Sequence, residues 1–262
     1  MLWEEIKRGF SRLSFLIVFM LVLIVCTVSA FKAPAYISLE DILHGYILTP
    51  HDGFIIFNPS SIGATLIIIM PLLSSLCYSD TYCEDLSCGI IKNIYTRKEK
   101  KKYLITKYIA NFIISGVAIA VPLVVNYIIL ILRYPNVKPN AILGPHTILS
   151  TQLFPNVYYE HPTLYIVLWI GIYFIYSGLF ASIGLSLSAL IKKKKIALFL
   201  PFILTLVALW TDEIFETIRI NPIDFLNMGR RQSFTLIISE FVILTIISFI
   251  LFFIGGQKSE TF

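Results

Sequence analysis

Six long runs of apolar residues, separated by shorter polar segments, dominate the 262-residue chain. About 20 helical residues cross the hydrocarbon core of a bilayer, and most of the runs are near or above that length. The pattern predicts an all-α membrane protein, with residues 1–262 forming a single six-helix domain. The expected spans are Leu13–Phe31, Ile62–Tyr78, Leu104–Leu132, Leu164–Ile191, Ile196–Trp210 and Phe234–Gly255.

The composition agrees with a lipid environment. Hydrophobic residues make up 57% of the chain and charged residues 14%, and the mean hydropathy is +0.81. A soluble domain usually carries about 25% charged residues, so membrane lipid is the expected surrounding of much of this surface. The net charge of +5 lies in loops beside apolar runs. That placement is ordinary membrane topology, and nucleic acid is therefore not an expected partner.

The basic residues are distributed unevenly between the two sides of the predicted membrane. Fifteen lysines and arginines fall on the side of the amino terminus, and six fall on the other side. This asymmetry predicts a multi-pass protein of the plasma membrane with both termini in the cytoplasm. The first apolar run has a basic leader like that of a signal peptide, but it is longer than a signal core, so a retained span is expected.

The amino-terminal residues predict a short helix before the first span. Trp3, Ile6, Phe10 and Leu13 recur at spacings of three and four, which places them on one helical face. Such a helix would lie along the cytoplasmic interface. Two readings are open: the helix is only a topological anchor, or it also contacts a cytoplasmic partner.

The loop between the second and third predicted spans, residues 79–107, contains more than the positive charge that sets membrane topology. Acidic residues precede basic ones, which suits a helix beginning near Asp80. Leu86, Ile90, Ile91 and Ile94 then form an apolar stripe at helical spacing. This amphipathic helix would fit a groove on another protein. Alternatively, it would rest on lipid headgroups, with its lysines on anionic phosphates.

The same loop contains a spaced motif made of Asp85, Gly89, Lys92, Asn93, Arg97 and Lys107. In these residues it resembles the loop between spans two and three of type-2 ATP-binding-cassette (ABC) exporter permeases of Gram-positive bacteria. It departs from the usual pattern at Ile90, where threonine is common, and in the unbroken Lys100–Lys102 run. The six-span count, the amino-terminal helix and the Asn221-Pro222 turn before the last span extend the resemblance.

The resemblance implies a coupling helix seated on a separate cytoplasmic ATPase subunit. Two ATPase chains would bind ATP and Mg, and the second permease chain would be identical or paralogous. This chain has no G-x-x-x-x-G-K-[ST] phosphate loop, so it is expected to be neither an enzyme nor a cofactor-binding chain. Leu86, Ile90 and Ile94 would be apolar anchors, with Asp85, Lys92 and Arg97 at the rim. The full expected contact set is Asp85, Leu86, Gly89, Ile90, Lys92, Asn93, Ile94 and Arg97.

Glu240 is the acidic residue that lies well inside a predicted span, and intramembrane carboxylates are candidate functional sites. The favoured function is nevertheless ATP-driven export of an amphipathic or hydrophobic compound: a peptide, an antimicrobial agent or a lipid-like molecule. An ion-coupled carrier or channel that uses Glu240 is the alternative, and a non-transporting scaffold or immunity protein is a third class. The segment Trp210–Ser233 is either re-entrant or an exposed loop. The histidines and cysteines lack the spacing of a metal site.

Overall fold

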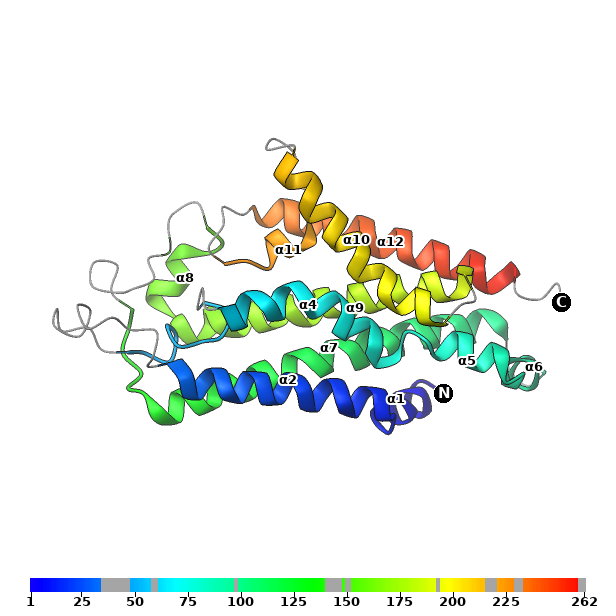
Figure 1. Ribbon diagram of the computed structural model, residues 1–262, viewed down its shortest axis with the longest axis horizontal. Coiled ribbons are helices and arrows are strands. Elements are labelled where there is room, and N and C mark those ends of the chain that lie inside the picture. The colour runs from blue at the N-terminus through cyan, green and yellow to red at the C-terminus, as the bar shows by residue number, and fades with distance from the viewer. Residues whose placement is uncertain are drawn as a thin grey trace.

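Six long helices form an elongated bundle (Figure 1). The computed structural model describes residues 1–33, 48–57, 61–96, 99–139, 148, 152–191, 194–214, 221–228 and 233–258. By length and composition, six helices within these residues could cross a membrane, which confirms the predicted number of spans. They are α2 (Leu13–Lys32), α4 (Ser61–Tyr78), α7 (Lys100–Arg133), α9 (Pro162–Ile191), α10 (Lys194–Ile214) and α12 (Phe234–Lys258).

Short helices gather at the two ends of the bundle. The amino terminus and the last turn of α12 lie at the end that carries α1, α5 and α6, whereas α8 lies at the opposite end (Figure 1). A further short helix, α11, lies between α10 and α12. The bounds are α1 Leu2–Phe10, α5 Thr81–Ser87, α6 Ile90–Tyr95, α8 Pro155–Glu160 and α11 Pro222–Phe225.

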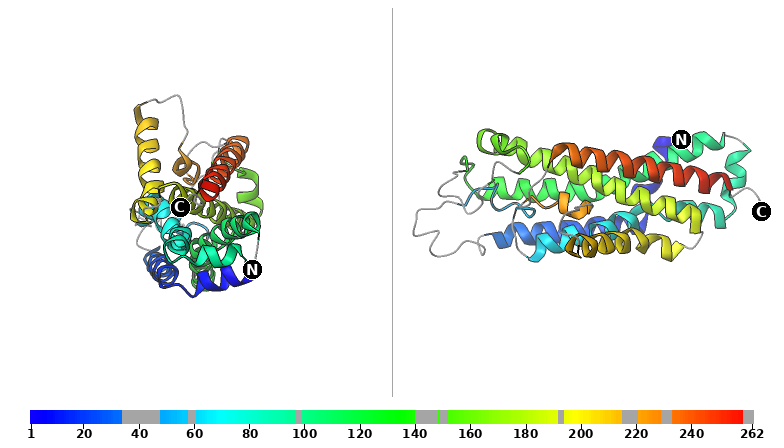
Figure 2. Two further views of the ribbon diagram at one scale, coloured as in Figure 1. Left: turned by 90° about the vertical axis from the view of Figure 1, so that its right-hand side faces the viewer. Right: turned by 90° about the horizontal axis from the view of Figure 1, so that it is seen from above.

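The centre of the bundle is the pair α7 and α9. Helix α9 packs against α4, α7, α10 and α12, and α7 also packs against α1 and α2. The view along the bundle shows α2, α10 and α12 at the periphery (Figure 2). These three helices expose many large apolar side chains, as a lipid-facing surface requires.

Two glycine–phenylalanine contacts interlock α7 with α9. A Cβ atom at Gly116 of α7 would lie 2.6 Å from the ring of Phe174 on α9, and one at Gly178 of α9 would lie 2.6 Å from the ring of Phe112 on α7. The two rings meet edge to face with their centroids 6.1 Å apart. Only a residue without a side chain leaves room for each ring, so these glycines set the close approach of the helices.

At the end of the bundle that carries α8, residues 48–57 pack between the long helices through buried polar groups. His51 is fully buried; its Nε2 lies 2.9 Å from Asn136 Oδ1 and its Nδ1 lies 3.0 Å from the Tyr127 hydroxyl. Burial lowers the pKa of His51 below its ordinary value of 6.5, and the Asn136 bond and the Asp52 charge offset part of this effect. Neutral His51 is therefore the form that this packing favours.

Residues 221–226, which lie between α10 and α12 in the sequence, reach into the bundle. Residues 221–226 are buried, and the Tyr173 hydroxyl donates a 2.7 Å hydrogen bond to the Leu226 carbonyl. Tyr173 lies eleven residues into α9, about 16 Å along the helix axis at 1.5 Å per residue. The described part of Trp210–Ser233 is therefore not a plain exposed loop; residues 215–220 and 229–232 lie outside the described residues.

Candidate functional site

Eight charged residues form a cluster at the end of the bundle that carries α1, α5 and α6. They come from α1, the junction between α1 and α2, the start and body of α5, α7 and α10. Four carboxylates face four cations, so their formal charges balance. The members of this charged cluster are Glu5, Asp80, Glu84, Asp85, Arg8, Arg12, Lys107 and Lys194.

The centre of the charged cluster is a buried ion pair. Lys107 and Asp85 are both fully buried, and Lys107 Nζ lies 2.6 Å from Asp85 Oδ2 and 3.0 Å from Glu5 Oε2. The Tyr103 hydroxyl donates to the same Asp85 oxygen over 2.7 Å, and Arg8 Nη2 lies 2.7 Å from Asp85 Oδ1. Buried charges persist only when partners such as these compensate them.

The ion pair with Asp85 affects the pKa of Arg8. Its side chain is 38% exposed. Partial burial would lower the pKa of Arg8, but the hydrogen bond and ion pair with Asp85 outweigh burial and raise it. Arg8 therefore remains a cation that fixes α1 against α5.

A second group of ion pairs fixes the start of α5 to two other helices. Arg12, just before α2, lies 2.8 Å from Glu84 Oε2 and 3.1 Å from Asp80 Oδ1. Lys194 at the start of α10 lies 2.8 Å from the other Asp80 oxygen. Asp80 is buried, so its charge too is compensated by residues distant in sequence.

The predicted single amphipathic helix is two helices in the structure. Helix α5 ends at Ser87, and α6 begins at Ile90 after Gly89, whose φ is +69°. This is the left-handed region that glycine adopts without strain, and Gly89 therefore turns the chain between the helices. Residues 87–90 are exposed, and the exposed fraction of Ile90 is 42%. We call these four residues the α5–α6 tip.

The turn divides the apolar stripe. Ile91 is buried in a small core with Tyr82 and Tyr103, against which Leu86 and Ile94 also pack. Ile90 is the member of the stripe that remains exposed, since the turn at the tip points it away from this core. Leu86 and Ile94 thus have partners within the chain, which was not expected of two anchors for another protein.

The remaining predicted contact residues have different surroundings. Asp85 was expected at an exposed rim and is instead at the buried centre of the charged cluster, because cations from α1 and α7 enclose it. Asn93 is exposed on α6. Lys92 lies in α6, but its side chain is outside the described part of the structure, as is all of Arg97.

The amino-terminal helix also differs from the predicted single apolar face. Ile6 and Phe10 pack against the main core, whereas Trp3 is 75% exposed. Gly9 allows this packing, because a Cβ there would collide with the side chain of Ile114 on α7. Helix α1 is therefore pressed against α7 and held by the charged cluster.

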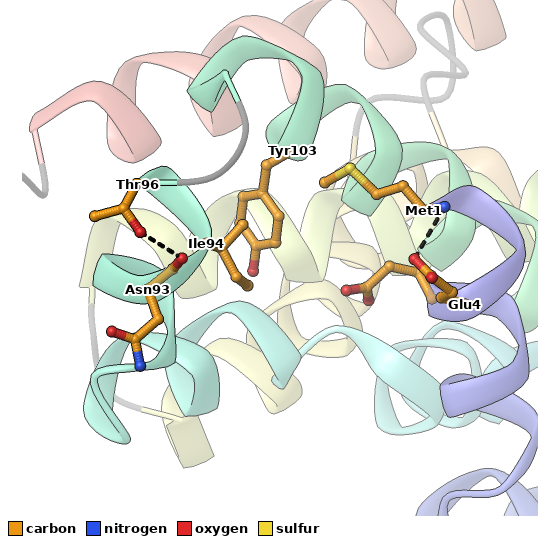
Figure 3. A pocket seen from close by; sticks show the side chains of 7 residues that line it. Met1, Glu4, Asn93, Ile94, Thr96 and Tyr103 are labelled. Atoms are coloured by element: carbon orange, nitrogen blue, oxygen red, sulfur yellow. Dashed lines mark hydrogen bonds and ion pairs between the residues drawn. The ribbon is translucent and has the colours of Figure 1, made fainter.

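A cavity of about 510 Å³ separates α1 from α6 beside the charged cluster. Figure 3 shows Met1 and Glu4 on one side, Asn93 and Thr96 on the other, and Tyr103 between them. This wall is mainly polar and includes residues of α6, the helix that follows the α5–α6 tip. It could receive polar side chains of a docked protein.

Glu240 lies away from the charged cluster, on α12. It is half-buried, and the Tyr176 hydroxyl of α9 donates a 3.2 Å hydrogen bond to its Oε2. No group of three or more metal-ligating side chains occurs among the residues that the structure describes.

The charged cluster was only partly visible in the sequence. Lys107 and Asp85 were identified as motif residues, but their pairing was not, and the part that Glu5 and Arg8 take in the cluster was missed. Acidic residues in a loop expected to be basic were the available signal. Comparison of the chain with family models, curated proteins and solved structures finds no match in any of the three.

Proposed function

We propose that this chain is the membrane-spanning permease subunit of an ATP-driven exporter. It moves an amphipathic or hydrophobic compound out of the cell and uses a separate cytoplasmic ATPase, two copies of which bind ATP and Mg. A second permease chain, identical or paralogous, completes the transporter. The six candidate spans and the resemblance of residues 85–107 to the coupling loop of type-2 ABC exporter permeases support this proposal. In this assignment the protein lies in the plasma membrane, with both termini in the cytoplasm.

The observation that carries the proposal is the attachment of the exposed α5–α6 tip to the long helices. A loop that only sets topology needs positive charge, not carboxylates. Here Asp80, Glu84 and Asp85 each pair with a cation from another part of the bundle. An exposed element that is fixed to α1, α7 and α10 can transmit a displacement to them.

This attachment gives the proposed mechanism. Closure of the two ATPases on ATP displaces the tip, and the charged cluster moves the adjoining helix ends with it as a rigid body. Lys107 and Asp85 are positioning residues in this step, since they hold α5 against α7 and are themselves buried. Ile90, Asn93 and the wall of the neighbouring cavity remain for direct contact with the ATPase.

The direct test is the substitution Ile90→Asp. An exposed apolar side chain that becomes buried in an interface contributes about 1–3 kcal/mol to binding. The affinity of the tagged chain for the ATPase should therefore fall by about 5- to 160-fold, and the yield of copurified ATPase should fall with it. The matched control is Gln257→Asp, which adds the same charge to an exposed position at the same end of the bundle. Intact association in the Ile90→Asp variant would refute contact at the tip.

Cys88 provides an independent test of orientation. It is exposed at the tip, whereas Cys26, Cys77 and Cys83 are buried. A membrane-impermeant maleimide should label inverted vesicles and spare intact cells, and a bound ATPase should protect the thiol. Labelling of intact cells would reverse the proposed orientation. A Cys88→Ser variant controls for reaction at the other thiols.

An ion-coupled carrier is the second candidate, favoured by the half-buried Glu240 and its hydrogen bond to Tyr176. It predicts transport driven by a proton gradient without any ATPase and abolished by Glu240→Gln. Transport that requires ATP hydrolysis and persists after dissipation of the gradient would exclude it.

A further inference from the structure

A second cavity, of about 420 Å³, opens between α10 and α12 at the level of the candidate spans. Both helices pack chiefly on α9 rather than on each other. Figures 1 and 2 show α10 diverging from α12, with α11 between them. Partly exposed walls at Leu204, Leu236 and Ile243 leave this cavity open at the side of the bundle.

The lining of this cavity is apolar except at a few positions. Phe180, Pro201 and Phe225 contribute to its walls, together with aliphatic side chains of α10 and α12. The hydroxyls of Thr205 and Ser239 donate to carbonyls of their own helices. Among the described lining residues, Glu240 is the one that carries an ionisable group. The volume is within the range of pockets that hold small organic molecules.

The side opening of the cavity and the carboxyl group of Glu240 together indicate which kind of molecule it binds. The side opening would admit a molecule dissolved in lipid, and the apolar walls would bury its hydrocarbon part. Tyr176 donates a hydrogen bond to Glu240 Oε2, which holds the carboxyl group in place at the wall of the cavity. Charge interactions are strong in such an apolar setting, so the carboxylate attracts a cation and repels an anion.

We propose that the α10–α12 cavity binds amphipathic organic cations, with Glu240 facing the positive group and the apolar walls enclosing the remainder. Binding of such a cation to the cavity does not require an ATPase. The further statement that these cations are the exported compound rests on the proposed function, and it narrows the cargo to lipophilic cations.

The test uses two ions of the same shape and opposite charge. Tetraphenylphosphonium and tetraphenylborate each carry four phenyl rings around one central atom. Equilibrium binding of each is measured on the full chain in lipid nanodiscs, with empty nanodiscs subtracted to remove partition into lipid. We expect saturable binding of the phosphonium ion that is at least about tenfold tighter than that of the borate ion.

Three variants locate the site. Glu240→Gln keeps the size of the side chain and a carbonyl acceptor for Tyr176, and should weaken phosphonium binding by about tenfold or more. Ala208→Phe fills the cavity from α10 and should abolish binding of either ion. Glu160→Gln removes a carboxylate from α8, outside the cavity, and should leave binding unchanged.

Several results would overturn the proposal. Equal binding of the two ions, or unchanged binding in Glu240→Gln, would refute selection of cations. Binding that survives Ala208→Phe, or no saturable binding to the wild-type chain, would refute the site. Because no ATPase is present in this assay, these failures are distinct from failure of the exporter assignment, which is read from ATPase copurification.

Discussion

Replacing Lys107 with methionine should destabilise the protein more than any change at an exposed lysine. Methionine is close in length to lysine but leaves Asp85 and Glu5 without their shared cation. Removing one member of a buried ion pair typically costs about 3–5 kcal/mol, because the other charge stays buried. Asp85 retains Arg8 at 2.7 Å and the Tyr103 hydroxyl. We therefore expect the free energy of unfolding to fall by about 3 kcal/mol, the lower end of that range.

Thermal unfolding of the purified chain in detergent measures this loss. At about 2–4 °C per kcal/mol for a chain near this size, the Tm of Lys107→Met should fall by about 6–12 °C. The control Lys102→Met removes an exposed lysine from the same helix and should shift Tm by no more than about 2 °C.

A double-mutant cycle with Asp85→Asn separates the ion pair from other effects of the substitution. The combined loss should be smaller than the sum of the single losses by about 1–3 kcal/mol. Strict additivity, or an unchanged Tm in Lys107→Met, would refute the account of the cluster as coupled buried charges.

Three other perturbations test separate parts of the bundle. Gly178→Leu forces a side chain into the Phe112 ring and should cost about 1–3 kcal/mol of stability, part of which Phe112→Ala in the same chain should restore; no restoration would contradict the interlock. Burial lowers the pKa of His51, so the unfolded chain binds more protons there. Stability from neutral His51 is present above its ordinary pKa of 6.5 and lost as pH falls below it. Between about pH 7.5 and about pH 5.5, Tm should fall further in the wild type than in His51→Gln, and equal falls would contradict this. Tyr173→Phe removes the hydrogen bond to the Leu226 carbonyl and should accelerate amide hydrogen exchange across residues 221–228, with about 1 kcal/mol lost; unchanged exchange would argue against that anchor.

The spans could be predicted because their signal is local. About 20 apolar residues in succession have few alternatives to a membrane helix, whatever the rest of the chain does. The helices extend beyond the apolar runs: α7 begins at Lys100, four residues before the predicted span, since lysine is a good helix former. Gly89 was the available signal for the split between α5 and α6, but it was interpreted as a motif residue rather than as a turn.

The charged cluster could not be predicted because its pairs join distant segments. Arg8 and Asp85 are 77 positions apart, and nothing in the spacing of either segment records the contact. The periodicity of residues 79–107 identified apolar and polar faces, but not which face the rest of the bundle would cover. Asp85 was therefore assigned to an exposed rim, although packing of α1 against α7 encloses it.

The glycine–phenylalanine interlock restricts how this protein can change shape. Sliding α7 along α9 by a single residue, about 1.5 Å, would carry each ring off its glycine and toward positions that bear side chains. These contacts therefore oppose sliding of α7 along α9, and we expect the two helices to move together as one rigid body. In the proposed exporter, a gate would then form where the outer helices α2, α10 and α12 move relative to this pair, and a ligand bound between α10 and α12 would hinder that movement.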